Sequence, residues 1–382
     1  MDTNLITKFI EENKEKYLAF LCDICSFEAR ATDKPELDCM LDFIAEFAQK
    51  EGFATDRTTM QNCGDFLSID INAGSEKSGL FLAHTDTVHP KGTFGSPAVK
   101  RTNDKIIAPG VIDCKAGIAI ALLVMKALKE NGYTKHVRLI LTSDEEVSNR
   151  LGGQAEIDFF NEKCNGFKWA INCETSEKDE VVISRKGILR YKLDVFGIGG
   201  HSGIHYFNCK NAIVETAHKI LALESKSEQN GITYSCNIIK SGTAINSIPD
   251  KCTFSIDVRV PRHSDVERAE QTVREVVQTD FLGGTSATLT TISIRPPMEK
   301  NDETLRLFEG LLDVCKKYDL GRLTPIESGG GSDSCFTQLA GVPSICGMGG
   351  CGGFCHTDRE YLEIDSFALR AKILALFTVD DN

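Results

Sequence analysis

Histidine and acidic residues follow apolar runs in this 382-residue chain, at spacings that suit metal chemistry. The apolar run over residues 79–83 ends in His84, and Asp86 stands two positions later. In an extended backbone, residues i and i+2 point to the same side. The Asp86 carboxylate can therefore reach the ring nitrogen that His84 does not use for a ligand, which is how a carboxylate orients a metal-bound imidazole. The triplet predicts a metal ligand with its orienting partner.

Four further segments offer ligands of the same kind, namely Asp113, the pair Glu145-Glu146, Glu174 and His356. Two histidines with several carboxylates form a mixed nitrogen and oxygen set that suits zinc, and less selectively cobalt or manganese. Five ligand residues are too many for one catalytic zinc, but they suffice for two metals that share a bridging carboxylate. Because Glu145 and Glu146 are adjacent, they point apart in most local geometries. One can bind metal while the other serves as a general base.

Each of these residues alone has a simpler interpretation. An isolated acidic residue is most often a solvated loop residue or a helix cap. Residues 144–146 could be the acidic first turn of a helix, and His356 beside Thr357-Asp358 could be an ordinary turn histidine. Their joint placement after predicted strands favours a shared site.

The apolar periodicity predicts an α/β fold. Amphipathic helices are expected over residues 3–26 and 35–51. Strands and helices then alternate, with strands over 66–72, 79–83, 137–142 and 169–173 and helices over 115–131 and 152–161. Such alternation indicates a mainly parallel sheet flanked by helices. Ligands bind beyond the carboxyl ends of such strands, and His84, residues 143–146 and Glu174 all fall there.

The pattern changes near residue 184. Strands are expected over 185–195, 233–239, 253–260 and 287–294, with helices over 211–223 and 265–279. This βαββαβ order is typical of a ferredoxin-like α+β sandwich. From about residue 298 the first pattern returns, with helices over 303–318 and 365–377 and a strand over 342–346. We therefore predict a catalytic domain in two pieces, 1–183 and 298–382, and an inserted domain over 184–297.

Composition narrows the class of partner. The net charge is −12, with acidic and basic residues interleaved, which argues against nucleic acid or anionic membrane and for small ligands. No apolar run approaches the ~20 residues that span a bilayer, and the first residues lack the features of a signal peptide. The fifteen cysteines are odd in number and scattered, so we expect reduced thiols and a cytoplasmic protein. Cys346, Cys351 and Cys355 invite an iron–sulfur or zinc interpretation, but no fourth cysteine stands at a standard spacing, and small loop residues are favoured.

Successive motifs resemble those of one family, the dizinc metallopeptidases and deacylases that include glutamate carboxypeptidase, acetylornithine deacetylase and succinyl-diaminopimelate desuccinylase. The similarity covers nearly the whole chain in order. The motifs are AHTDTV (83–88), PGVIDCKAG (109–117), TSDEE (142–146), NCE (172–174), GHSG (200–203), GGGSD (329–333) and CHTDREY (355–361). Cys114 and Ser332 depart from the residues most frequent in the family, but neither removes a ligand.

The resemblance implies two zinc ions per subunit, with cobalt or manganese as alternatives. His84 and Glu174 would bind one ion, Glu146 and His356 the other, and Asp113 would bridge them. The family also has a cis peptide bond after the bridging aspartate, which here joins Asp113 to Cys114.

The resemblance also implies catalytic roles. Glu145 would be the general base, and Asp86 would orient His84. The inserted domain would form a homodimer, in which His201 reaches the neighbouring site and stabilises the tetrahedral oxyanion. Asn246 and Arg259 match further substrate-binding positions of the family.

The resemblance implies hydrolysis of an amide bond to an amino acid, and two details favour a carboxypeptidase. Arg295 matches an arginine that binds the free carboxylate in glutamate carboxypeptidases, a task suited to a guanidinium, although it could equally be a solvated hinge residue. Gly331 of the glycine-rich motif is expected beside the substrate. Glu174 disfavours the aminopeptidase branches but does not separate a carboxypeptidase from a deacylase. The alternatives are an N-acyl-amino-acid deacylase and, more remotely, an inactive homologue that binds amino-acid-like ligands, against which the intact Glu145 argues.

Overall fold

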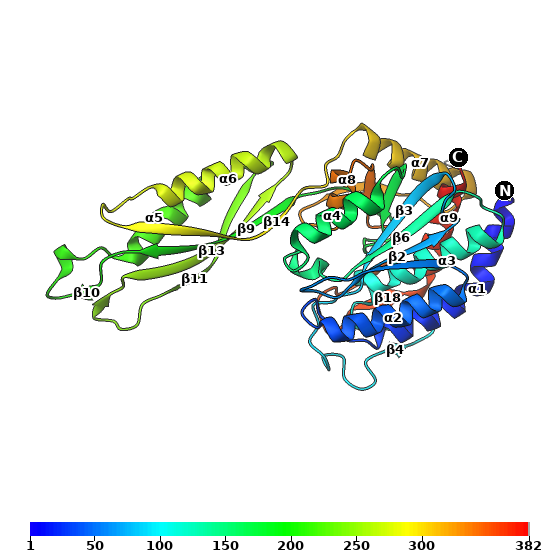
Figure 1. The fold of residues 1–382 in the computed structure, drawn as a ribbon, viewed down its shortest axis with the longest axis horizontal. Coiled ribbons are helices and arrows are strands. Elements are labelled where there is room, and N and C mark those ends of the chain that lie inside the picture. Colours follow the sequence, from blue (N-terminus) through cyan, green and yellow to red (C-terminus); the bar gives the residue numbers. More distant parts are fainter. Residues whose placement is uncertain (381–382) are drawn as a thin grey trace. The chain divides into compact units, whose positions relative to one another are not determined.

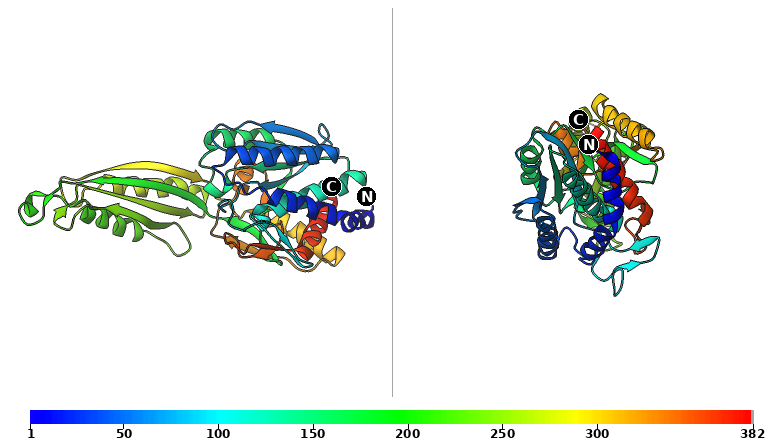
Figure 2. Two further views of the ribbon diagram at one scale, coloured as in Figure 1. Left: turned by 90° about the horizontal axis from the view of Figure 1, so that it is seen from below. Right: turned by 90° about the vertical axis from the view of Figure 1, so that its right-hand side faces the viewer.

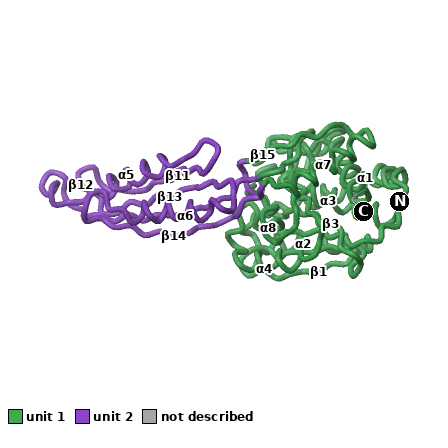
Figure 3. The backbone as a smooth tube through the Cα atoms, turned by 90° about the horizontal axis from the view of Figure 1, so that it is seen from above, with its two compact units in different colours: residues 1–184, 300–328, 332–382 green, residues 185–299, 329–331 purple. Residues whose placement is uncertain are grey.

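The computed structural model describes residues 1–380 and divides into two compact units (Figure 3). Unit 1 comprises residues 1–184, 300–328 and 332–380, and unit 2 comprises residues 185–299 and 329–331. Each unit is described separately below. No helix among the described residues is long and apolar enough to cross a membrane.

Unit 1 is built around a sheet that, within residues 1–380, has eight strands in the order β1-β2-β6-β3-β7-β16-β8-β15. The strands are β1 (Ala54–Thr58), β2 (Phe66–Ile71), β3 (Lys77–His84), β6 (His136–Thr142), β7 (Trp169–Asn172), β8 (Glu180–Arg185), β15 (Thr324–Ser328) and β16 (Ser344–Cys346). The central strands β6, β3, β7 and β16 run parallel, whereas β1, β2 and β8 pair antiparallel. The expected α/β class with a mainly parallel central sheet is confirmed.

Helices cover both faces of this sheet, as the views in Figures 1 and 2 show. One face packs against helices α1 (Thr3–Cys25), α2 (Lys34–Lys50), α3 (Ala116–Glu130), α7 (Asp302–Tyr318) and α9 (Ile364–Asp380). The other face carries the shorter helices α4 (Gly153–Cys164) and α8 (Ser334–Leu339). Side chains along a strand alternate between the two cores: Phe81 belongs to the first, and Leu80 and Leu82 to the second.

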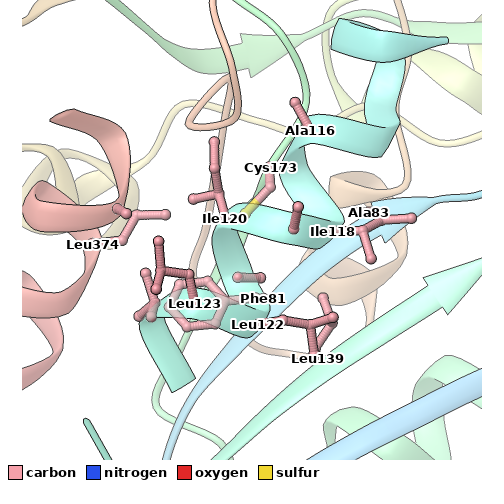
Figure 4. Close-up of a cluster of buried hydrophobic side chains, with 14 of the residues drawn as sticks. Phe81, Ala83, Ala116, Ile118, Ile120, Leu122, Leu123, Leu139, Cys173 and Leu374 are labelled. Carbon is pink, nitrogen blue, oxygen red and sulfur yellow. The ribbon is translucent and has the colours of Figure 1, made fainter. Parts of the chain in front are cut away.

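Helix α3 lies at the centre of the first core. Its residues from Ala116 to Met125 are all buried, as expected for a helix that is apolar on every side. Figure 4 shows Ile118 and Leu122 of α3 beside Ala83 of β3 and Leu139 of β6, with Leu374 of α9 across the helix. This packing fixes the start of α3 against the carboxyl ends of the strands.

The apolar patterns did not predict several short or polar elements. Strand β1 is largely exposed, so it has no apolar run, and α8 is only six residues long. A small sheet of order β17-β18-β5-β4 is also new; its strands are β4 (Lys100–Arg101), β5 (Lys105–Ile107), β17 (Gly352–Gly353) and β18 (Tyr361–Glu363). This sheet pairs strands that precede unit 2 in the chain with strands that follow it.

Unit 2 has the order βαββαβ with a sheet of order β11-β13-β9-β14. Its elements are β9 (Gly187–Phe196), β10 (Gly200–His201), α5 (Ala212–Glu224), β11 (Thr233–Ser241), β12 (Ser247–Ile248), β13 (Lys251–Val260), α6 (His263–Gln278) and β14 (Ser286–Arg295). Strand β13 alternates strictly between buried and more accessible side chains, because α5 and α6 cover one face of the sheet. The unit therefore has its own core, separate from that of unit 1.

Candidate metal centre

The carboxyl ends of three neighbouring parallel strands gather the first candidate ligands. His84 is the last residue of β3, Glu174 follows β7, and Glu145 and Glu146 stand in the 3-10 helix η2 (Glu145–Val147) after β6. Since β6, β3 and β7 are adjacent and parallel, these residues meet at one edge of the sheet. His84 Nε2 lies 3.6 Å from Glu174 Oε1.

Asp113 lies between the two histidines. It stands in the short segment η1 (Val111–Lys115), whose backbone is not helical at Asp113 and Cys114, directly before α3. One carboxylate oxygen is 3.0 Å from His84 Nε2, and the other is 3.1 Å from His356 Nε2. The peptide bond between Asp113 and Cys114 is cis, as the resemblance predicted.

His356 completes the cluster from the second sequence piece of unit 1. Its Nε2 also lies 3.3 Å from Glu146 Oε2. Three groups of side chains bring potential ligand atoms within 4.8 Å of one another: His84, Cys114 and Glu174; Asp113, Cys355 and His356; and His84, Asp113 and Glu146. The five residues predicted as ligands thus converge on one place.

Asp86 connects two of these ligands. Its Oδ1 is 3.2 Å from His84 Nδ1, the ring nitrogen that faces away from Asp113, and its backbone carbonyl is the hydrogen-bond partner of that nitrogen at 3.1 Å. Its Oδ2 accepts a hydrogen bond from the backbone N–H of Glu146 at 3.0 Å. Asp86 is fully buried, so both contacts lie in a region of low dielectric.

The electrostatics of the cluster suit a cation. Burial raises the pKa of Glu146 to about 8, with the Asp113 charge adding to the rise and the His356 hydrogen bond opposing it. A hydrogen bond to Asp113 raises the pKa of His356 far above its usual value. Burial lowers the pKa of His84, but the nearby carboxylates, Glu174 foremost, leave it well above its usual value. Three carboxylates and two imidazoles lie within reach of one another, and a bound metal would take the place of the protons that they share.

One buried oxygen atom also indicates a metal site. Glu146 Oε1 is shielded from solvent and has no hydrogen-bond partner among the described residues. An unsatisfied buried carboxylate oxygen is costly in a folded protein unless an ion or water meets it. The residues present therefore fit a divalent metal.

Glu145 lies buried beside these ligands. It is 8% exposed and belongs to none of the three ligand groups found among the described residues. Its backbone carbonyl accepts the N–H of Ser148 at 2.8 Å, which closes the turn of η2. Its neighbour Glu146 reaches His356, so the two glutamates differ in surroundings although they are adjacent.

The predicted residues of unit 2 form two groups rather than one. His201 pairs with Ser247 in the β10–β12 ribbon, and Ser202 donates to the Asn246 carbonyl, so His201 and Asn246 are neighbours. Arg259 and Arg295 instead flank Ile188, one on each side of strand β9.

The arginine group has its own contacts. The Arg259 guanidinium contacts the Asp257 carboxylate and donates to the Gly329 carbonyl at 3.1 Å. Arg295 is 2% exposed, and Gly331 lies so close that a Cβ there would stand 2.9 Å from Arg295 Cδ. The two groups sit at opposite ends of the ten-residue strand β9, roughly 30 Å apart along its length.

Two cysteines at the cluster escaped prediction as site residues. Cys355 was expected to be a small loop residue, but its Sγ lies 2.9 Å from Asp113 Oδ2. Cys114 donates to the Cys173 carbonyl at 3.2 Å and lies within reach of His84 and Glu174. The sequence did offer one indication, since each of these cysteines is directly next to a predicted ligand in the chain. The structure pairs none of the fifteen cysteines in a disulfide.

Known structures with the same fold differ in activity. A tripeptidase from Staphylococcus aureus superposes with a TM-score of 0.79 at 18% identity, covering 97% of this chain and 98% of that one. An M20 family metallo-carboxypeptidase from Sulfolobus solfataricus gives a TM-score of 0.77 at 17% identity, covering 95% and 99%. These likenesses concern the fold.

Sequence relatives point to two activities. Carboxypeptidase G2 of Pseudomonas sp. (strain RS-16) is 24% identical over 387 aligned residues, covering 99% of this chain and 92% of the relative. Succinyl-diaminopimelate desuccinylase of Rickettsia akari (strain Hartford) is 24% identical over 351 residues, covering 84% and 89%. The family model of peptidase family M20/M25/M40 matches residues 80–380, which include every candidate ligand. The chain therefore belongs to peptidase family M20/M25/M40, a family of metal-dependent hydrolases.

Proposed function

We propose that this M20 metallohydrolase is a dizinc carboxypeptidase that releases a C-terminal amino acid from a small peptide. The observation that carries the proposal is the Asp113 carboxylate, whose two oxygens face two different histidines at 3.0 and 3.1 Å. A carboxylate placed in this way suits a bridge between two metals.

The chain's residues would hold the metals in two sets that share Asp113. His84 and Glu174 form one set, and Glu146 and His356 the other. When bound, two zinc ions polarise the substrate carbonyl and acidify the attacking water. Cobalt and manganese suit the same ligands.

The proton transfers fall to Glu145. As a general base it accepts a proton from the attacking water, and it then delivers that proton to the leaving amine. Its buried position directly beside the proposed ligand Glu146 supports this role. Asp86 holds the His84 ring in one orientation throughout.

Substrate recognition is proposed for the arginine group. A guanidinium is the natural bidentate partner for the free α-carboxylate of a peptide. Arg295 stands beside the glycine-rich segment 329–331, where Gly331 packs so closely against it that a side chain would not fit. Arg259, on the other side of Ile188, is oriented by Asp257.

A homodimer is proposed for the assembly. His201 and Asn246 lie at the end of β9 opposite to Arg259 and Arg295, so one copy of unit 2 does not bring all four to one substrate. Helix α5 and the edge strand β11 expose large apolar side chains, namely Ile213, Val214, Leu221, Ile238 and Ile239. Exposed apolar patches of this kind mark protein interfaces. A second copy seated there would supply His201 to its neighbour's site, where the imidazole would stabilise the oxyanion.

A second candidate is an N-acyl-amino-acid deacylase, which the similarity to a desuccinylase supports. Both reactions cleave an amide with the same metal centre and differ in the group that is recognised. For either reaction we propose the cytoplasm as the compartment, since fifteen free cysteines suit a reducing environment.

A substrate panel tests the proposal. Peptides with C-terminal glutamate and other residues are compared with N-acetyl and N-succinyl amino acids, in the presence of zinc, cobalt or manganese. Higher kcat/KM for the peptides is the expected result. Preference for the acylated amino acids would establish the deacylase instead, and metal-independent turnover would contradict the metal centre itself.

A further inference from the structure

Glu360 is a buried carboxylate beneath the loop that carries Asp113. The residue is 0% exposed. It accepts hydrogen bonds from three backbone N–H groups, those of Gly110 at 3.2 Å, Ile112 at 2.9 Å and Asp113 at 3.2 Å. Three donors from one short loop thus converge on a single side chain that lies some 250 positions away in the sequence.

The small sheet of unit 1 places Glu360 there. Strand β18 pairs antiparallel with β5, with Tyr361 opposite Ile107. Glu360 directly precedes β18, and its carbonyl accepts the N–H of Ala108 at 3.3 Å. The register of this strand pair therefore sets the Glu360 side chain against residues 110–113, which continue from β5.

A fourth donor completes the arrangement. His89 Nε2 lies 2.8 Å from Glu360 Oε2, and His89 is also buried, with its ring edge-on to Phe94. An ionised carboxylate offers about four acceptor sites, and here three N–H groups and one imidazole meet them. Hydrogen bonds to a charged acceptor are shorter and stronger than neutral ones.

Asp113 is thereby fixed at both ends. Its backbone N–H is bound to Glu360, while its carboxylate lies between His84 and His356. Gly110 adopts φ +66°, a left-handed conformation that a side chain would disfavour. The loop turns its N–H groups inward at this point, and buried N–H groups need hydrogen-bond partners. Without Glu360 those buried donors would be left unsatisfied.

We propose that Glu360, supported by His89, is a positioning residue that presets the Asp113 carboxylate for metal. The proposal rests on the function proposed above, in which Asp113 bridges the two metals. Glu360 follows His356 by four positions, so one segment supplies a ligand to the centre and also holds the loop of the bridging ligand. Outer partners of this kind change metal affinity or activity by roughly 10–100-fold when removed.

The test is Glu360→Gln, measured by titrating zinc into metal-free protein against a competing chelator. Glutamine has nearly the same shape, but its NH2 group must face an N–H donor of the loop or His89. We expect zinc affinity to fall roughly 10–100-fold, with kcat/KM recovering at saturating zinc. His89→Leu keeps the three backbone contacts and is expected to change affinity in the same direction by less, and it gives the same measurement if Glu360→Gln does not fold.

A matched control separates positioning from stability. Asp70 is another buried carboxylate of unit 1, bound by an imidazole, His136, and by Arg138. These partners lie toward the amino-terminal end of β6, away from Glu145 and Glu146. Asp70→Asn should lower Tm and leave zinc affinity unchanged.

The outcomes are distinct. If Glu360→Gln lowers Tm as Asp70→Asn does but binds zinc as the unchanged protein does, Glu360 is only structural and the proposal is overturned. Asp113→Ala addresses the underlying function. If that variant retains both zinc ions, the bridge itself is wrong; if it loses zinc while Glu360→Gln keeps full affinity, only the positioning role fails.

Discussion

The Asp86 carboxylate accepts the backbone N–H of Glu146 at 3.0 Å, and this bond ties the end of β3 to the turn that follows β6. The other oxygen of the same carboxylate faces His84 Nδ1 at 3.2 Å. One buried side chain thus sets the orientation of two proposed ligands that belong to different metals. Shifting it should disturb both.

Asp86→Asn tests this coupling. Asparagine has one carbonyl oxygen, so it can face the His84 ring or accept the N–H of Glu146 but not both, and it carries no charge; the contact of His84 Nδ1 with the backbone carbonyl of residue 86 would remain. We expect kcat/KM and metal affinity to fall roughly 10–100-fold, the usual cost of losing an outer partner of a ligand. Steady-state kinetics and zinc titration would check this. An effect on one metal alone would show that only one of the two contacts matters.

His84→Ala examines the division of ligands between the metals. The proposed sets assign His84 to the metal shared with Glu174 and leave the other with Glu146 and His356. Elemental analysis should therefore find one zinc per subunit instead of two, with activity severely reduced. His356→Ala is the mirror control and should also retain one zinc. Loss of both ions from either variant would argue against two separable sets.

Metal binding is expected to release protons. In the metal-free protein the pKa of His84 and that of His356 are both raised above the ordinary value near 6.5. These histidines therefore stay charged at neutral pH, and they must lose their protons before they bind zinc. Zinc affinity should rise with pH, and the calorimetric binding enthalpy should vary with the ionisation enthalpy of the buffer. A buffer-independent enthalpy would contradict charged histidines.

The same two histidines should make the stability of the metal-free protein fall with rising pH, whereas zinc affinity rises. A histidine whose pKa is higher in the folded than in the unfolded protein stabilises the fold. The stabilisation is complete below the pKa of the unfolded protein, near 6.5, and it is lost as the pH rises through the pKa of the folded protein. Thermal unfolding of metal-free protein should therefore show a decline in Tm above neutral pH. His84→Ala and His356→Ala should each flatten that decline.

Mixed dimers test whether His201 acts in the neighbouring subunit. Glu145→Gln alone should lower kcat roughly 10²–10⁴-fold while both metals stay bound, and His201→Ala should also be impaired. When equal amounts of the two variants exchange subunits, half of the dimers contain one copy of each variant. In such a dimer, one of the two sites combines an intact Glu145 from one copy with an intact His201 from the other. About a quarter of full activity should return for a two-fold symmetric dimer. No recovery would place His201 in the site of its own subunit.

The sequence predicted the parts of the molecule in which local pattern and chemistry agree. His84 ends an apolar strand, and Glu174 follows another, so periodicity located both the strands and the edge at which their ligands meet. The exposed strand β1 and the short helix α8 had no such pattern. Their formation depends on the sheet they join.

Contacts between distant segments were harder to foresee. Cys355 reaches Asp113 only because the turn before β18 folds against η1. Glu360 binds backbone N–H groups, which have no signature in the sequence of their own loop. Glu360 belongs to the recognised motif CHTDREY, but its role follows from strand pairing and not from spacing.

The place of β16 in the sheet has a consequence for how the protein is made. Strand β16 lies between β7 and β8, yet it follows all of unit 2 in the chain, as do His356 and Glu360. A nascent chain emerging from the ribosome therefore presents four of the five proposed ligands while β7 still lacks its neighbour. Such long-range pairing is slow and leaves strand edges exposed during synthesis. Closure of the sheet and completion of the proposed set of Glu146 and His356 are thus delayed until unit 2 has been synthesised.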